Sequence, residues 1–313
     1  MPIIYDLQRH FLVITIMNIL IAATASLGIL ILNPVFAQNV QPDQQQNKAT
    51  TFQYSYEAGL VLDDNVSRAK YQADIQDDTI ASFSVGVKSS MPLSDYTRLT
   101  LGGRVEAEKY DVFGQLDNVK YFVDLKYQFA FGSGFSSPTY ALKLSLGGIE
   151  SKSDIRTSET AHLGIGINKW LTTTINLSSA YTMKVREAET EVFDTRENQI
   201  MLNLDVDISS RQLIYLSYHF IDGDVVTSAT PKPSTYDIAQ VSEQDDAFKG
   251  LTTNQWAYRI DARSQVFTVG YNAAVNRQLS VDISYQTIDS QATESDQVYY
   301  DRGIIRASVL GRF

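Results

Sequence analysis

From residue 51 onward, apolar and polar side chains alternate along the chain with a period of two. In the clearest segment, residues 119–129, every odd position is apolar, while Lys120, Asp124 and Lys126 occupy even positions. This alternation is typical of a β-strand with one apolar and one polar face. About twelve such segments recur, each about ten residues long, the length that a tilted strand needs to cross a membrane. They are residues 52–60, 81–87, 99–107, 119–129, 140–146, 161–167, 175–185, 200–208, 214–220, 267–273, 279–285 and 305–313.

The connections between these segments alternate between short and long. The short ones are 89–96, 131–138, 168–171, 209–211 and 276–278, and the long ones are 63–78, 149–159, 187–197, 222–254 and 289–298. Soluble β-sandwiches also alternate, but short periplasmic turns facing longer outer loops are typical of transmembrane barrels, as are aromatic residues near strand ends such as Tyr54, Tyr127 and Tyr218. The pattern therefore predicts an all-β fold over residues 51–313, a transmembrane antiparallel up-and-down β-barrel.

The predicted number of strands depends on how residues 255–266 are read. Tyr258 and Ile260 have the opposite parity to Phe267 and Val269, so a bulge or a separate outer extension is expected near residues 255–266. Both chain ends on the periplasmic side require an even number. Twelve strands satisfy this condition best, and ten or fourteen remain open.

The first fifty residues have a different character. An apolar stretch runs over residues 11–32, Pro34 interrupts it, and Val35-Phe36-Ala37 supplies small residues where a leader peptidase cleaves. We expect residues 1–37 to be a signal peptide, with an uncleaved helix as the alternative. Residues 38–50 are rich in Gln and show no apolar periodicity, so we expect a short disordered periplasmic tail.

Composition narrows the class of function. The net charge of −10 disfavours binding to phosphate backbones, so nucleic acid is not an expected partner. The chain has no Cys, which excludes disulfides, thiolate catalysis and Cys-ligated metals. No cofactor is indicated.

The C-terminal segment ends on an alternating strand whose apolar face carries Ile305, Ala307, Val309 and Phe313. It resembles the C-terminal signal of Gram-negative outer-membrane proteins, although Gly311 stands where an apolar or aromatic residue is usual. The resemblance implies recognition of Phe313 by the barrel-assembly machinery, and a final location in the outer membrane, in contact with its lipid.

The first strand and loop carry a second resemblance. Residues 56–69 read YEAGLVLDDNVSRA and look like the opening of putative porin families. These include barrels associated with exopolysaccharide export and the barrels of surface-lipoprotein assembly modifiers. The latter carry helical repeats before the barrel, for which this chain has no room. The resemblance implies a porin-type barrel with a link to polysaccharide export.

Catalytic residues are sparse. Ser217 and His219 share a strand face, but the order is reversed relative to outer-membrane phospholipase and deacylase families, and no third group is evident. His162 has no serine at the matching spacing, and Asp222 and Asp224 only faintly resemble an omptin-type protease site. We therefore expect no enzyme activity, and both histidines to be polar residues of the interior.

Paired carboxylates occur in three loops, but none has the ligand spacing of a defined calcium loop. We expect solvated loop tips and no metal site at these positions: Asp63/Asp64, Asp77/Asp78 and Asp245/Asp246.

The polar face of the strands holds the candidate functional residues. Basic and acidic side chains are segregated along the sequence, so a closed barrel would place a largely basic wall opposite an acidic patch. Two interpretations remain open: a field across a solute path, or charges that pair across a plugged interior. The lumen-lining candidates are Arg98, Arg104, Lys120, Lys126, Lys143, Asp205, Asp207, Asp282 and Arg306.

The leading hypothesis is a porin-like channel for passive passage of small polar solutes. One alternative is a structural or interaction barrel that acts through surface loops, above all residues 222–254, which either enter the interior or stand outside. An outer-membrane hydrolase is the remaining alternative.

Overall fold

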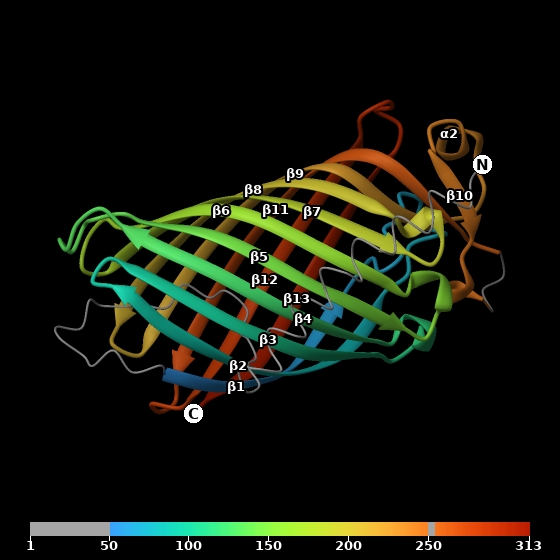
Figure 1. Cartoon of the computed structure of the whole chain (residues 1–313). Coiled ribbons are helices and arrows are strands. Elements are labelled where there is room, and N and C mark those ends of the chain that lie inside the picture. The colour runs from blue at the N-terminus through green and yellow to red at the C-terminus, as the bar shows by residue number, and fades with distance from the viewer. Residues whose placement is uncertain (1–50, 250–253) are drawn as a thin grey trace.

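A computed structural model describes residues 51–249 and 254–313, so the expected signal peptide and tail lie outside the described residues. The chain forms a closed antiparallel β-barrel of twelve strands with one extra strand outside the ring (Figure 1). The strands are β1 (Thr51–Asp63), β2 (Asp78–Ser94), β3 (Thr97–Tyr110), β4 (Asn118–Ala130), β5 (Thr139–Ser151), β6 (Ser158–Trp170), β7 (Ile175–Ala188), β8 (Thr195–Ser209), β9 (Gln212–Ala229), β10 (Val241–Gln244), β11 (Trp256–Ala274), β12 (Leu279–Ala292) and β13 (Tyr299–Arg312). The short helical segments are η1 (Gly114–Leu116), η2 (Asp154–Arg156), η3 (Glu191–Phe193), α2 (Pro233–Tyr236) and η4 (Asp246–Phe248).

Each ring strand pairs with its neighbours in sequence, and two further pairings complete the ring. β9 pairs with β11 along its whole length, and β13 pairs with β1 from Ser55↔Arg312 to Asp63↔Ile304. β10 pairs only with the first residues of β11, Trp256 to Arg259, and is the strand outside the ring. The prediction of a twelve-strand up-and-down barrel is therefore confirmed. No described helix is long and apolar enough to cross a bilayer.

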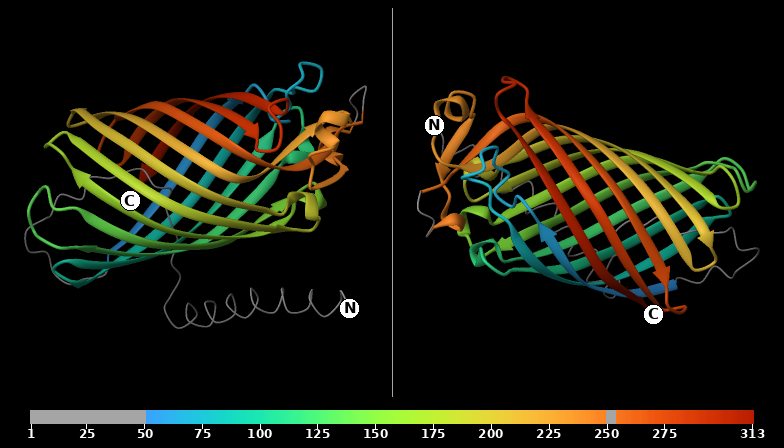
Figure 2. Two further views of the ribbon diagram at one scale, coloured as in Figure 1. Left: turned by 90° about the horizontal axis from the view of Figure 1, so that it is seen from above. Right: turned by 180° about the vertical axis from the view of Figure 1, so that it is seen from behind.

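The two ends of the barrel differ in their connections, as the three views show (Figures 1 and 2). The turn end carries the short connections and the chain ends of β1 and β13. The loop end carries six connections, of which loops 1 and 5 are the longest in the barrel: loop 1 (64–77), loop 2 (111–117), loop 3 (152–157), loop 4 (189–194), loop 5 (230–255) and loop 6 (293–298). Loop 2 is not among the connections expected from the sequence. The alternation also ended β2 at Val87, whereas the strand continues to Ser94. In outer-membrane barrels the loop end faces the outside of the cell.

The outer surface of the barrel is an apolar belt with many aromatic side chains. Leu60, Phe83 and Ile165 are each more than half exposed, which only a lipid environment makes favourable. Tyr54 and Tyr218 are also exposed on this surface, as the alternation predicts. The belt and the closed ring place the protein in the outer membrane of a Gram-negative bacterium.

β11 explains the change of parity near residues 255–266. It runs without any register shift against either β9 or β12, so this strand has no bulge. The alternative, an outer extension, is present: residues 256–261 run past the end of β12, and Trp256–Arg259 pair with β10 outside the ring.

The environment of β11 also changes along its length. Near the loop end, Tyr258 and Ile260 point inward and are buried, whereas Phe267 and Val269 farther along face the lipid. The opposite parity marks this change from an apolar inner face to an apolar outer face.

Loops 1 and 5 pack over the loop end, where apolar side chains of the loops and of the strand ends form three small clusters. In one, Phe248 of loop 5 contacts Phe113 of loop 2, with the ring centroids 4.9 Å apart. In another, Ala69 of loop 1 packs on Tyr258 and Ile260 of β11. Residues 222–229 belong to β9, and the described part of loop 5 contains α2, β10 and η4. The described part of residues 222–254 is thus built from regular elements that belong to β9 and to the packed loop end.

Candidate functional site

The strand registers place all nine lumen-lining candidates on the inner face of the barrel. On β4, for example, Val119, Tyr121 and Val123 are exposed outward, so Lys120 and Lys126 point inward. Register transfers this parity around the ring. The inward set is Arg98, Arg104, Lys120, Lys126, Lys143, Asp205, Asp207, Asp282 and Arg306.

Toward the loop end and the middle of the barrel, several inward basic residues have acidic partners. Lys120 Nζ lies 2.7 Å from Glu108 and 3.5 Å from Glu106, and Arg104 lies 3.8 Å from Glu106. On the far side, Lys184 lies 3.4 Å from Glu197. In this region the charges pair, as the plugged-interior interpretation expects.

Asp282 lies near the turn end, three residues after β12 begins at Leu279, and is held in a local hydrogen-bond network. Its carboxylate is 2% exposed and accepts hydrogen bonds from the Tyr215 hydroxyl at 3.0 Å and from Asn272 Nδ2 at 3.2 Å. Arg306, on the adjacent strand β13, is close enough for its charge to act on Asp282 and on Glu57. The two candidates therefore form one local network.

Toward the turn end the arrangement is different. Five inward basic residues form a band from β13 to β5 that skips only β1, which we call the basic stripe: Arg312 (β13), Lys88 (β2), Arg98 (β3), Lys126 (β4) and Lys143 (β5). Among the described residues only Lys143 has a carboxylate within ion-pair distance, Asp124 at 4.0 Å. Sequence reasoning did not select Lys88, because the alternation of β2 was ended at Val87. Its position after Ser82, Ser84 and Gly86 on the same face was the available signal.

Asp205 and Asp207 lie on β8, near the same end of the barrel. β8 is six strands from β2 in either direction around the ring, so the two aspartates occupy the wall opposite the basic stripe. Asp205 accepts a hydrogen bond from Asn203 Nδ2 at 2.7 Å. The segregation expected from sequence is thus found at the turn end only.

The loop end is fastened by buried carboxylates. Asp245 of loop 5 is bound by Arg156 of loop 3 and by the Ser228 hydroxyl of β9. Asp74 of loop 1 accepts from the Thr230 hydroxyl at 2.8 Å and from Lys232 at 3.3 Å.

The carboxylate pairs predicted to be solvated loop tips are corrected by these contacts. One member of each pair is buried: Asp63 is 2%, Asp78 5% and Asp245 2% exposed. Asp78 accepts from the backbone N–H groups of Asp111, Val112 and Phe113 at 2.9–3.1 Å, which holds loop 2 in place. In the part of the chain that the structure describes, no three His, Asp or Glu side chains are grouped to hold a metal ion. These carboxylates are structural anchors.

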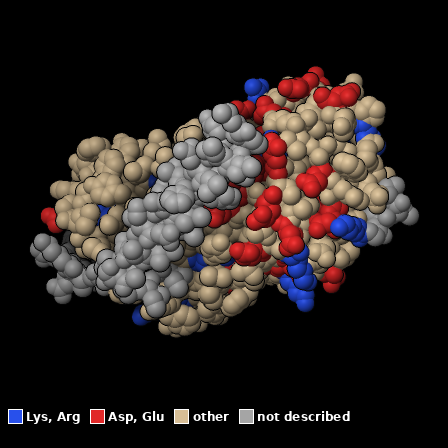
Figure 3. Space-filling view, turned by 45° about the vertical axis from the view of Figure 1, so that its right-hand side comes forward, with Lys and Arg blue, Asp and Glu red and all other residues tan. Residues whose placement is uncertain are grey.

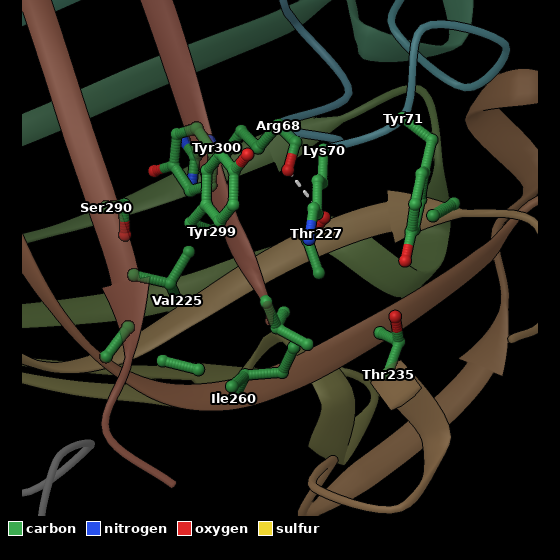
Figure 4. Close-up of a pocket in the computed structure, with 14 residues that line it drawn as sticks. Arg68, Lys70, Tyr71, Val225, Thr227, Thr235, Ile260, Ser290, Tyr299 and Tyr300 are labelled. Atoms are coloured by element: carbon green, nitrogen blue, oxygen red, sulfur yellow. Dashed lines mark hydrogen bonds between the residues drawn. The ribbon is translucent and has the colours of Figure 1, made fainter. Parts of the chain in front are cut away.

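A small pocket lies at the loop end, between loop 1 and strands β9, β11, β12 and β13 (Figure 4). Lys70 Nζ lies 4.4 Å from the centroid of the Tyr299 ring, and the Thr227 hydroxyl donates to the carbonyl of Arg68 at 2.5 Å. Its free volume of about 30 Å³ leaves room for only one or two water molecules. The exposed surface around this end carries acidic side chains, among them Asp111, Asp154 and Glu191 (Figure 3).

Ser217 and His219 lie on the inner face and contact each other. Ser217 Oγ is 2.9 Å from His219 Nε2, and the amide nitrogen of Gln199 contacts Nδ1. Ser217, His219 and Gln199 therefore form one polar group of the barrel interior. Asp222 lies on the outer face and pairs with Arg263 at 3.2 Å, so it contributes nothing to this group.

Comparison with known proteins gives a fold relationship. No family model matches the sequence, and no curated protein matches it. Among solved structures, an outer-membrane channel from Pseudomonas putida F1 is similar with a TM-score of 0.55 and 10% identity, over 89% of this chain and 100% of that chain. A KdgM porin in complex with oligogalacturonate matches with a TM-score of 0.41 and 8% identity, over 83% and 99% of the two chains. The chain therefore has the fold of the outer-membrane channel from Pseudomonas putida F1.

Proposed function

We propose that the protein is a porin-like channel that lets small polar solutes cross the outer membrane passively. The observation that carries this proposal is the basic stripe, a band of unneutralised charge on the inner face of a lipid-exposed barrel. A filled structural barrel gains nothing from such a band, because half-buried like charges destabilise the fold. In a water-filled passage the same charges remain solvated and act on solutes.

The packed loop end is part of this proposal. Loops 1 and 5 narrow or close the outer mouth, and the solute path runs from there past the paired region to the basic stripe. A secondary proposal is a link to polysaccharide export, which rests on the resemblance of residues 56–69 alone. Export through a signal peptide at residues 1–37 and insertion by the barrel-assembly machinery through Phe313 are further parts of the proposal.

Reconstitution into planar lipid bilayers tests the channel. We expect discrete conductance steps from the purified barrel, and larger or more frequent steps from Asp245→Ala, which releases loop 5 from Arg156. Asp237→Ala is the matched control, because Asp237 is an exposed acid of the same loop. Absence of current from both the wild type and Asp245→Ala would reject the proposal.

An interaction barrel that acts through its loops is the second candidate, favoured by the ordered surface that loops 1 and 5 build at the loop end. β9 continues to Ala229, so a deletion that removes loop 5 should begin after that residue. If the protein acts by binding, replacing residues 230–254 with a short linker abolishes surface or partner binding. If it is a channel, that variant keeps or increases its conductance.

A further inference from the structure

We propose that the basic stripe makes this channel selective for anions and binds small carboxylate or sulfate solutes on their way through. The inference rests on the proposed channel function and names its substrate class. Its members are the five inward basic residues defined above, on β13, β2, β3, β4 and β5.

Basic side chains of the stripe lie next to one another. Lys126 and Lys143 are direct cross-strand partners on β4 and β5, and both point inward. Two like charges opposite each other destabilise a sheet. Lys88 is close enough to Arg98 and Arg312 for their charges to act on it, and Lys126 is likewise affected by Lys88 and Arg98. The five side chains therefore share one region of positive potential.

Carboxylate partners are scarce around the basic stripe. Lys120 and Arg104, nearer the loop end, have glutamates at 2.7–3.8 Å. Among the described residues, no carboxylate lies within ion-pair distance of Lys88, Arg98, Lys126 or Arg312; the ion pair of Lys143 with Asp124, at 4.0 Å, is long. The same barrel thus neutralises one group of basic residues and leaves another group available to a mobile anion.

The wall opposite the basic stripe is acidic. Asp205 and Asp207 face the stripe across the barrel from β8 and give the passage a transverse field. At this level the inward acidic residues are Asp205, Asp207, Asp282 and Asp124, the last of which pairs with Lys143. The five basic residues still leave a net positive charge, so anions are concentrated relative to cations. A solute with a carboxylate or sulfate at one end and hydroxyl groups at the other matches both walls, because hydroxyls can donate to the aspartates.

Reversal potentials in a KCl gradient test the selectivity. We expect the wild type to pass chloride in preference to potassium. Neutralising the centre of the stripe in a Lys88→Gln, Arg98→Gln, Lys126→Gln variant should remove this preference while channel steps persist. The matched control is Lys109→Gln, which removes a positive charge from the exposed outer face of β3. A wild type that prefers potassium, or a triple variant that keeps the preference for chloride, would overturn the inference.

Citrate binding separates this inference from the channel proposal. Calorimetry on the detergent-solubilised barrel should show citrate binding that becomes roughly tenfold weaker or more in the triple variant and is unchanged in Lys109→Gln. Binding without any bilayer current would uphold the anion site and reject the channel. Current without citrate binding or anion preference would uphold the channel and reject the anion site.

Discussion

The role of Gly311 depends on Tyr56, its neighbour across the barrel seam, which is the pairing of β13 with β1 that closes the ring. Gly311 pairs with Tyr56 of β1, and a Cβ at position 311 would collide with the Tyr56 ring. That ring also stacks on Phe313, with the centroids 5.9 Å apart. The glycine that departs from the usual C-terminal pattern therefore makes space for an aromatic from the first strand, which covers the site instead.

Replacing Gly311 with Leu should destabilise the barrel, although it brings the C-terminus closer to the usual pattern. The new side chain displaces Tyr56 from Phe313, and overpacking of this kind costs about 1–3 kcal/mol. The free energy of unfolding in detergent, measured with guanidinium, should fall by this amount. Pairing Gly311→Leu with Tyr56→Ala should restore part of the loss. Unchanged or higher stability of the single variant would contradict this account of the seam.

A buried ion pair at the other end of the same seam gives a second prediction. Arg302 Nε lies 2.9 Å and 3.0 Å from the two carboxylate oxygens of Asp63, which is 2% exposed. Arg302→Met leaves that carboxylate buried without a counter-charge, so we expect a loss of about 3–5 kcal/mol in the free energy of unfolding. Asp63→Asn combined with Arg302→Met should be more stable than Arg302→Met alone. Equal stability of the two variants would show that the charge on Asp63 is not the cause.

At the level of elements, alternation predicts the ring strands, whereas it does not predict how the loop end packs. Alternation identified the ring because each strand has lipid on one side and polar groups on the other. β11 shows where the rule fails: its inner face is apolar near the loop end, because loop 1 and loop 5 supply an apolar partner there. That partner comes from distant parts of the chain, and periodicity carries no information about it. For the same reason the buried state of Asp74 and Asp245 could not be read locally.

The fastening of loop 5 gives a prediction at this scale. Asp245→Ala removes the carboxylate that joins η4 to Arg156 and Ser228, and leaves the Arg156 guanidinium without that partner. We expect trypsin to cleave loop 5 of the variant in lipid vesicles much faster than in the wild type, because local opening becomes cheaper. Asp237→Ala should behave like the wild type. Equal cleavage rates for Asp245→Ala and Asp237→Ala would mean that Asp245 does not hold the loop.

For the whole molecule, the absence of Cys allows a direct test of orientation. A single cysteine at Glu294, in loop 6, should react with a membrane-impermeant maleimide in intact cells. A single cysteine at Ser133, in the turn between β4 and β5, should react only after the outer membrane has been permeabilised. Both positions are exposed, so reactivity reports the side of the membrane. Labelling of Ser133→Cys alone in intact cells would reverse the assigned orientation.

The contacts between loop 1 and the later strands also dictate an order of assembly. Thr230 and Gln255 bind Asp74 across sequence separations of 156 and 181 residues, whereas most ring strands pair with the next strand along the chain. Closing such long loops of chain is slow compared with forming hairpins. Loop 1 therefore completes these contacts only after β9 and loop 5, more than 150 residues later in the chain, have folded beside it. A barrel with a packed loop end is by that fact one in which the strands from β1 to β11 have already come together.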